Sequence, residues 1–204
     1  MASTLPNSPY GFKPVRHQNG GVIRAASYTI ASAYASNIFA GDLVSMASAA
    51  ARNIILNTTS LFVRGVFMGC EFVDSAGNTR FEKMWVASTA ILAGTVITAY
   101  VYDDPLIIFK AMVSGVSATT FAATDVNAYY APAGQSSGST LTGMSAEYAN
   151  FATYTKTANK NVSLFLYNLT GNPGNDPVNF GGYTEAEFLI VQSDLIAQWA
   201  HTLV

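Results

Sequence analysis

The sequence is poor in charge. Lys, Arg, Asp and Glu make up 11% of the 204 residues, whereas 50% are hydrophobic, and an ordinary soluble domain carries roughly 25% charged residues. So few charges indicate that much of the surface faces protein. The ten basic and twelve acidic residues also fall short of the basic density that binding to a phosphate backbone requires, so we expect no nucleic-acid partner.

Cysteine and histidine are scarce as well. Cys70 is the single cysteine, so we expect no internal disulfide and no cysteine-based metal cluster. Because it lies in an apolar run, we interpret it as a small buried hydrophobic residue rather than a reactive thiol. The two histidines, His17 and His201, are near the ends of the chain, where rigid positioning is least expected. We therefore predict no acid–base catalysis by histidine.

Long apolar runs and enzyme motifs are missing too. No apolar run approaches the roughly 18 residues that span a bilayer, and no basic segment followed by an apolar stretch marks a signal peptide. We expect a protein made in a cytoplasm, without a membrane partner. The chain has no phosphate loop, H-E-x-x-H or EF-hand spacing. Together with the scattered acidic residues, this predicts a protein without enzymatic activity, metal or cofactor.

What the sequence has in quantity is strand-forming segments. Residues 95–102 are almost wholly β-branched or aromatic, and 106–113 form a second such run. The link between them is too short for a crossover helix, so we expect these strands to pair antiparallel or to form one bent strand. The spacing of such runs along the chain predicts an all-β fold, a compact barrel or sandwich of eight to twelve short strands.

Two acidic pairs have more than one interpretation. Asp103 and Asp104 are either metal ligands or, as we favour, residues of an Asx turn that ends a strand. Glu185 and Glu187 share a face if residues 185–204 begin with a strand, which we favour over an amphipathic helix. On that face they are either a carboxylate pair for acid–base chemistry or, in our preferred interpretation, solvated surface residues.

The first 27 residues differ from the rest. They are rich in Pro, Gly, aromatic and basic residues, and the first acidic residue is Asp42. Such a stretch buries little surface by itself. We therefore expect residues 1–27 to be an extended arm that orders on a neighbour, and residues 28–204 to be a β-domain that folds without it. The candidate residues for an interface with a neighbouring chain are Tyr10, Phe12, Pro14, Val15, Arg16, His17 and Arg24.

Residues 114–150 are rich in small and polar side chains and poor in large apolar ones. We expect a loop-rich insertion there. Tyr129 and Tyr130 lie in this segment, and tyrosine buries a large area at low entropic cost while keeping a polar end. Both are therefore candidates for an interface in a loop.

Several segments of the first half carry a family resemblance. The run Tyr10-Gly11-Phe12-Lys13-Pro14-Val15-Arg16-His17 is followed by residues 20–24, 28–32, 38–44, 65–74 and 99–105, and together they resemble the start of a group of virion proteins of tailed bacteriophages. Gly41-Asp42-Leu43-Val44 followed by Gly65-Val66 is similar, more weakly, to trimeric head-decoration proteins of lambda-like phages.

The resemblance implies a capsid decoration, or cement, protein. In those families a compact β-domain trimer lies on the outer surface of the capsid, and an N-terminal arm adds to the lattice. The partners so implied are the major capsid protein and further copies of the chain itself, and the implied location is the virion.

Two other classes of protein fit part of the same pattern. A trimeric head-fibre, tail-spike or glycan-binding module is also rich in strands and aromatic residues, and Tyr129 and Tyr130 would be its sugar-stacking residues. A hydrolase would need Glu185 and Glu187 together in one pocket. Copy number per virion separates a cement protein, with hundreds of copies, from a fibre or vertex protein, with a dozen or fewer.

Overall fold

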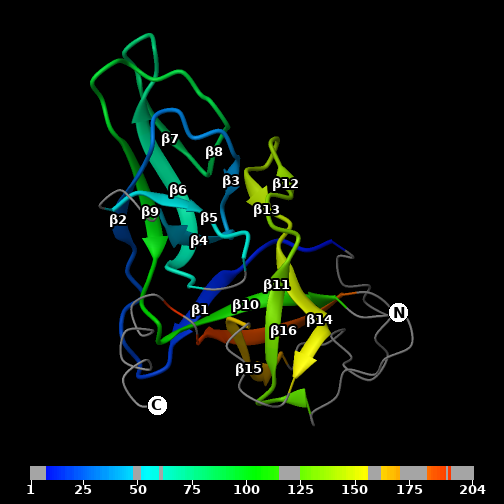
Figure 1. Ribbon diagram of the computed structural model, residues 1–204. Coiled ribbons are helices and arrows are strands. Elements are labelled where there is room, and N and C mark those ends of the chain that lie inside the picture. Colours follow the sequence, from blue (N-terminus) through cyan, green and yellow to red (C-terminus); the bar gives the residue numbers. More distant parts are fainter. Residues whose placement is uncertain are drawn as a thin grey trace, which may run out of the picture.

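The computed structural model describes residues 8–47, 52–59, 62–114, 125–155, 162–170, 183–191 and 193. These residues form sixteen strands, and there is no α-helix among them (Figure 1). The all-β fold expected from the sequence is confirmed. The strands make a closed barrel in the lower part of Figure 1, the lower barrel, and a rolled sheet above it, the upper sheet. In this part of the chain no helix is long and apolar enough to cross a membrane.

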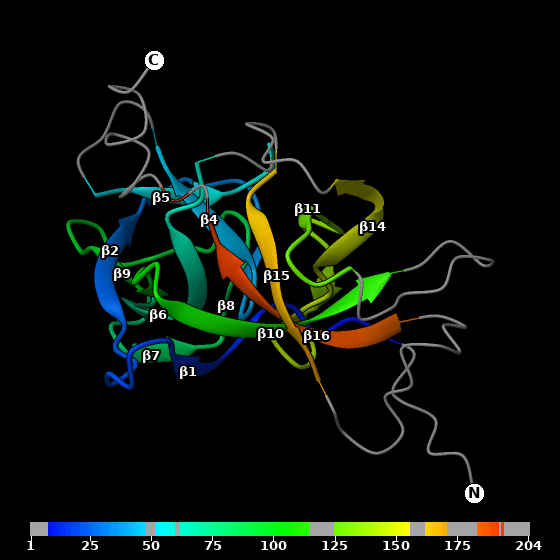
Figure 2. The same cartoon turned by 90° about the horizontal axis from the view of Figure 1, so that it is seen from below.

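The lower barrel closes with five strands. In order around the barrel they are β10 (Ile107–Ser114), β14 (Tyr148–Thr155), β11 (Tyr129–Ala133), β15 (Leu164–Leu169) and β16 (Tyr183–Ile190). The pairing of β16 with β10 closes the ring, and only β10 and β14 run parallel. Figure 2, seen from below, shows β10 crossing the molecule beside β16. Closure gives each barrel strand a neighbour on both sides, so few backbone groups are left unpaired.

Large rings fill the interior of the lower barrel. Phe109, Tyr130 and Phe188 are at most 1% exposed, and the rings of Tyr130 and Phe188 meet edge to face with their centroids 5.9 Å apart. Leu43 and Val66, which belong to strands of the upper sheet, are part of the same core. The lower core therefore extends under the upper sheet and joins the two parts.

The expected insertion over residues 114–150 is wrong for the residues that the structure describes. Residues 129–133 and 148–155 are the barrel strands β11 and β14, and a hairpin of β12 (Gly138–Ser139) and β13 (Met144–Ser145) lies between them. The shortage of large side chains misled the prediction, because alanines fill the spaces between the rings here; Ala128 and Ala149 are both 0% exposed. Residues 115–124 lie outside the described residues.

The upper sheet holds a second core. Its strand order is β2 (Ala26–Ile30), β9 (Ile97–Tyr102), β6 (Gly65–Val73), β4 (Leu43–Met46) and β5 (Ile54–Leu56), and β7 (Thr79–Glu82) pairs with β6. The sheet rolls up until its two ends meet, where Thr29 forms a bridge with Asn53. Inside, Phe67 and Trp85 are at most 1% exposed. Trp85 belongs to β8 (Met84–Trp85), which pairs with β3 (Ile38–Phe39).

A β-bulge bends β6 around this core. The register of β6 against β9 shifts between Phe67 and Gly69, and a Cβ at position 69 would lie 2.7 Å from the carbonyl oxygen of Glu82. Only glycine allows so close an approach of β7. The bulge also leaves Met68, the residue between them, 43% exposed on the outside.

The expected free arm is wrong for residues 8–27, which are part of the fold. β1 (Lys13–His17) pairs antiparallel with β10, along the part of its edge that β14 leaves open. Phe12 is 1% exposed in the lower core, where its ring meets that of Phe188 with the centroids 6.5 Å apart. This stretch forms no core of its own, and it is ordered because it packs against the surface of the barrel. Residues 1–7 lie outside the described residues.

Asp103-Asp104-Pro105 carries the chain from one part to the other. β9 pairs with β2 and β6, and β10 pairs with β1, β14 and β16. The two segments are therefore separate strands in different sheets, and neither the antiparallel pair nor the single bent strand expected from the sequence is correct. The N–H of Leu106 donates to Asp104 Oδ1 at 2.9 Å. This is the expected Asx turn.

We predict that Phe12→Ala lowers the free energy of unfolding by about 3–5 kcal/mol, because it leaves a cavity between Phe188 and the barrel. Urea unfolding followed by tryptophan fluorescence measures this. Val22→Ala is the control, since Val22 is 75% exposed and its truncation should change stability by no more than about 0.5 kcal/mol. A protein lacking residues 1–24 should also fail to fold, and a cooperative, wild-type-like unfolding curve for it would contradict the assignment of these residues to the core.

Candidate interaction surface

Most of the interface residues expected in the arm bind within the chain. The hydroxyl of Tyr10 donates to Glu185 Oε1 at 2.7 Å, and Lys110 Nζ lies 3.3 Å from Oε2 of the same carboxylate. Arg16 forms an ion pair with Glu187, with Nη2 and Oε2 2.6 Å apart. These contacts fasten β1 and the residues before it to β10 and β16, so they explain the basic and aromatic composition of this stretch without a partner.

Glu185 and Glu187 do share one face of β16, yet they are not solvated. They are 8% and 9% exposed, and the groups that cover them come from β1, β10 and Tyr10. The solvated-surface interpretation is therefore wrong. The sequence could not show that a basic strand from the other end of the chain lies over these carboxylates. Burial, and then the hydrogen bond to Glu185, raise the pKa of Tyr10 well above its ordinary value, so Tyr10 stays a neutral donor.

Of the remaining arm residues, Pro14 and His17 are partly buried and Val15 and Arg24 are exposed. Pro14 lies opposite Phe109 in the β1–β10 pairing, and His17 Nε2 lies 3.1 Å from Asp104 Oδ2. Val15, at an irregularity in the register of β1, is 44% exposed, and Arg24 is exposed in the segment before β2. Of the expected arm interface, only these last two offer their side chains freely to another molecule.

The tyrosines expected in a loop lie in strand β11. Tyr130 is 0% exposed, so its assignment as an interface residue is wrong. Tyr129 is partly buried, and its ring packs on that of Phe165 with the centroids 5.2 Å apart. A pair of strand residues points to opposite sides of the sheet, and here one side is the barrel interior. Neither ring is presented for stacking on a sugar in the way that a loop would present it.

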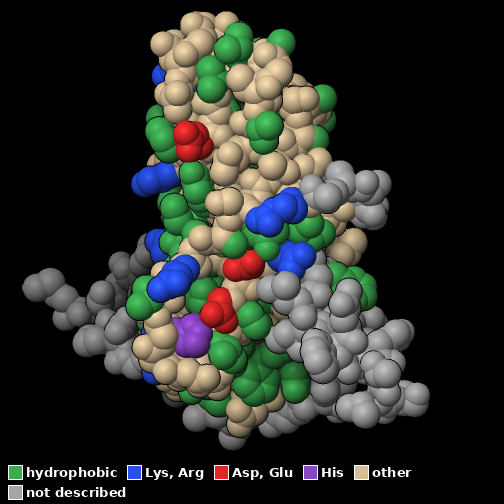
Figure 3. All heavy atoms as spheres, turned by 90° about the vertical axis from the view of Figure 1, so that its left-hand side faces the viewer, with side chains coloured by type: hydrophobic (Ala, Val, Ile, Leu, Met, Phe, Trp, Pro, Cys, Tyr) green, Lys and Arg blue, Asp and Glu red, His purple; other side chains and the backbone are tan. Residues whose placement is uncertain are grey.

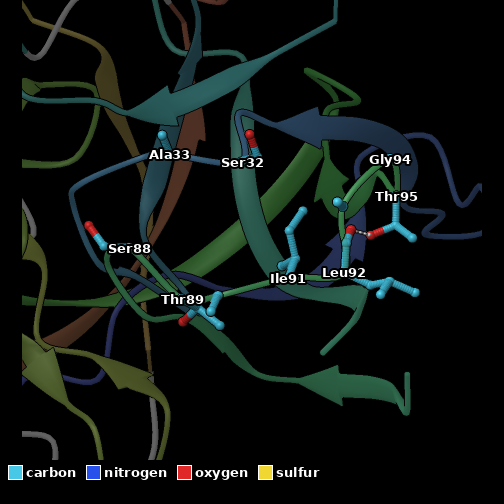
Figure 4. Close-up of a pocket in the computed structure, with 10 residues that line it drawn as sticks. Ser32, Ala33, Ser88, Thr89, Ile91, Leu92, Gly94 and Thr95 are labelled. Atoms are coloured by element: carbon cyan, nitrogen blue, oxygen red, sulfur yellow. Dashed lines mark hydrogen bonds between the residues drawn. The ribbon is translucent and has the colours of Figure 1, made fainter. Parts of the chain in front are cut away.

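A pocket of about 660 Å³ opens on the upper sheet between residues 32–33 and the loop of residues 88–95. Figure 4 shows its lining, which is made of small aliphatic and hydroxyl side chains and backbone; the hydroxyl of Thr95 is turned back to the carbonyl of Leu92 at 2.6 Å. The lining has no titratable and no aromatic side chain. It offers hydrogen bonds but no acid or base that would activate one of its hydroxyl groups.

The charges that the protein has are grouped. On the side seen in Figure 3, basic and acidic side chains gather near the middle of the molecule, and large areas above them are uncharged. Arg52 and Arg64 both lie over the ring of Tyr28, whose hydroxyl donates to Asp103 at 2.6 Å. The part of the chain that the structure describes has no group of three or more His, Cys, Asp or Glu placed to hold a metal ion.

The outer face of the upper sheet is an exposed β-surface. In the pairings of β2, β9, β6 and β7, the residues on this face include Ser27, Thr29, Thr98, Tyr100, Glu71 and Phe81, with Met68 exposed beside them at the bulge. Phe81 is 71% exposed. The single acid, Glu71, accepts a hydrogen bond from the hydroxyl of Tyr100 at 2.9 Å. We call these seven residues the outer face.

The outer face ends at an open sheet edge. Among the described residues β7 pairs only with β6, and all four residues of β7 are exposed. An unpaired edge with an aromatic residue at its centre is a surface on which another chain can add hydrogen bonds and apolar contact. Sequence reasoning missed Met68 and Phe81 because an apolar residue in a strand predicts burial, and only the bulge and the edge position expose these two.

We predict that Phe81→Ser leaves the free energy of unfolding within about 0.5 kcal/mol of wild type, because its ring lies mostly in solvent. Phe67→Ser is the matched control on β6: Phe67 is 1% exposed, and its loss should cost at least 3 kcal/mol, on the order expected for truncating a buried ring. Chemical denaturation of both variants measures this. Equal destabilisation by the two changes would mean that the outer face is covered in the native protein.

Cys70 gives a second test. It is 2% exposed, and burial, followed by the charge of Glu82, raises the pKa of its thiol to about 12. Because the thiolate is the reactive form, the native protein should not react with a thiol reagent at pH 8 and should react fully in denaturant. Rapid reaction of the native protein would contradict the interpretation of Cys70 as a buried hydrophobic residue.

Comparison of the chain with protein-family models, with curated proteins and with solved structures finds no match.

Proposed function

We propose that this protein is a structural component of a tailed-phage virion, which binds the outside of the capsid as a homotrimer and stabilises the contacts between major capsid protein subunits. The observation that carries the proposal is the outer face: a β-surface with an exposed aromatic edge and one hydrogen-bonded acid, in a chain with 11% charged residues. The family resemblance of the first half is the reason for proposing a tailed-phage capsid as the assembly to which the protein binds.

A surface of this kind favours binding to protein. It can contribute the burial of Phe81 and Met68, which are 71% and 43% exposed, and backbone hydrogen bonds along β7. It costs little desolvation of charge, because Glu71 is already engaged by Tyr100. Such a contact is modest for one copy. On a closed shell many copies act together, so weak contacts become effective through avidity.

The stabilising action follows from thermodynamic linkage. A protein that binds only where neighbouring capsid subunits are correctly placed adds its binding free energy to the intact shell and none to the dissociated subunits. Because β1 and Phe12 belong to the fold, the proposal no longer needs residues 8–17 to reach a neighbour. It places the capsid contact on the outer face, with Val15 and Arg24 available for a second contact.

The alternative is a head-fibre, tail-spike or glycan-binding module. The residues that favoured it are not placed in the structure as such a module requires. Its sugar-stacking pair was Tyr129 and Tyr130, and Tyr130 is fully buried. The hydrolase hypothesis used Glu185 and Glu187, and these carboxylates are held by Tyr10, Lys110 and Arg16, an arrangement that a structural role explains.

Binding to heads tests the proposal. Purified protein is mixed with expanded, empty heads of the phage that encodes it, and the pelleted heads are analysed for bound copies. We expect saturation at hundreds of copies per head, and a trimer by analytical ultracentrifugation. Phe81→Asp should weaken binding at least tenfold, roughly the loss of one apolar anchor at an interface.

The control is Leu141→Asp, an equal change of charge at a residue that is 94% exposed in the turn between β12 and β13, which should bind like the wild type. Failure of the wild type to pellet with heads would refute the capsid assignment. Saturation at a dozen copies or fewer would support a fibre or vertex component instead.

A further inference from the structure

Two carboxyl groups are buried where the lower barrel meets the upper sheet. Asp42 lies in the turn between β3 and β4, Glu147 lies between β13 and β14, and both are 0% exposed. Neither belongs to the outer face. Sequence reasoning assigned no role to either, although Asp42 stands in the apolar run of residues 38–44, which is a signal of burial.

In each carboxylate, one oxygen accepts a hydrogen bond and the other has no partner among the described residues. Asp42 Oδ2 accepts the N–H of Phe39 at 2.7 Å, and Glu147 Oε2 accepts the N–H of Leu43 at 2.8 Å. The other oxygens, Asp42 Oδ1 and Glu147 Oε1, have no hydrogen-bond partner among the described residues. The Ser145 hydroxyl accepts the N–H of Glu147 at 2.9 Å. It lies near enough to Asp42 to favour its ionised form, but makes no hydrogen bond of good geometry with Oδ1.

Among the residues that the structure describes, no positively charged group forms an ion pair with either acid. The charged residues on the segments packed around them are engaged elsewhere or exposed: Lys13 lies over the ring of Tyr10, Arg64 over that of Tyr28, Glu71 accepts from Tyr100, and Lys83 is exposed. Of these elements, only the backbone N–H groups of Phe39 and Leu43 and the Ser145 hydroxyl act on the pair.

Two carboxylates in one buried site cannot both ionise without a counter-charge, since each disfavours the charge of the other and both lose solvation. We propose that Asp42 and Glu147 share a proton at neutral pH, on the oxygens that lack partners, and that its loss in alkaline solution loosens the joint between the lower barrel and the upper sheet. A metal ion is a poorer occupant, because the neighbouring carbonyls of Ala40, Gly41 and Asp42 are already hydrogen-bonded to N–H groups.

The direction of the pH effect follows from the two pKa values. Burial raises the pKa of Asp42 to about 6, and burial together with the charge of Asp42 raises that of Glu147 well above its ordinary value. Both are raised relative to the unfolded chain, so the folded state binds more protons. The stabilisation is complete below about pH 4 and decreases as the pH rises through 6 and beyond.

Thermal unfolding between pH 5 and pH 8 tests the proposal. We expect the Tm of the wild type to fall over this range by at least about 5 °C more than the Tm of Glu147→Gln or Asp42→Asn, which remove one titrating group and keep the shape. At pH 8 each variant should melt at or above the wild type. A purely structural contact would give variants that are less stable at every pH.

Glu82→Gln is the matched control, because it removes an exposed glutamate of β7, and its Tm should follow the wild-type slope. The infrared spectrum of the wild type at pH 7 gives a measurement that needs no variant: the carbonyl band of a protonated carboxyl group should be present. Absence of that band, or equal slopes for wild type and Glu147→Gln, would overturn the proposal. So would a rise in Tm with calcium at pH 8 in the wild type but not in Glu147→Gln, which would show a cation in place of the proton.

Discussion

The turn of residues 39–43 is the point on which both parts of the molecule depend. Its backbone is bonded to three other segments: the carbonyl of Gly41 accepts from Phe12, its N–H donates to Phe67 of the upper sheet, and the carbonyl of Ala40 accepts from Ser145. The segments come so close that a Cβ on Gly41, which has φ +100°, would lie 3.1 Å from the Cα of Gly11. Glycine is required at position 41 on both counts. Because the first strand, the upper sheet and the β12–β13 hairpin all meet this turn, it fixes the two cores relative to each other, and side chains elsewhere can be small and uncharged without loss of a defined fold.

The sequence predicts the class of this fold and several of its strands because those depend on local properties. Residues 95–102 are β-branched and aromatic, and β9 occupies Ile97–Tyr102; Asp104 ends the strand region through its own Asx turn. The division into a barrel and a rolled sheet is not local. It depends on β1 from the start of the chain lying against β10, and on β16 closing the ring from the other side. A stretch such as residues 8–17 looks unable to fold when judged alone, since the surface that orders it lies about a hundred residues away in the sequence.

The sequence predicts that the chain has a surface for binding protein, but it does not predict which residues form that surface. Low charge indicates a chain that contacts protein, yet it does not say which strands carry the contact. The aromatic residues that looked available, Phe12 and Tyr130, are at most 1% exposed, whereas Phe81 is 71% exposed. The difference is a property of pairing: within the part of the chain that the structure describes, Phe81 is in a strand with a neighbour on one side only. Periodicity shows which residues share a face, and only the assembled sheet shows whether that face is covered.

The buried acids at the joint have a cost that an apolar pair of the same size would avoid. Their contribution is to favour one register of the lower barrel against the upper sheet over its neighbours. Apolar side chains would pack acceptably after a small shift of one part against the other, but Glu147 can accept from the N–H of Leu43 in one register only, and Asp42 closes its own turn through Phe39. A shift by one residue would leave those N–H groups buried and unpaired, at a cost of roughly 1–3 kcal/mol each. Few large side chains in residues 125–155 interlock with the upper sheet. The hydrogen bonds of the two acids therefore fix how the lower barrel and the upper sheet are joined. A proton shared between them reduces the net charge that this buried joint holds, and so reduces the cost of placing two acids there.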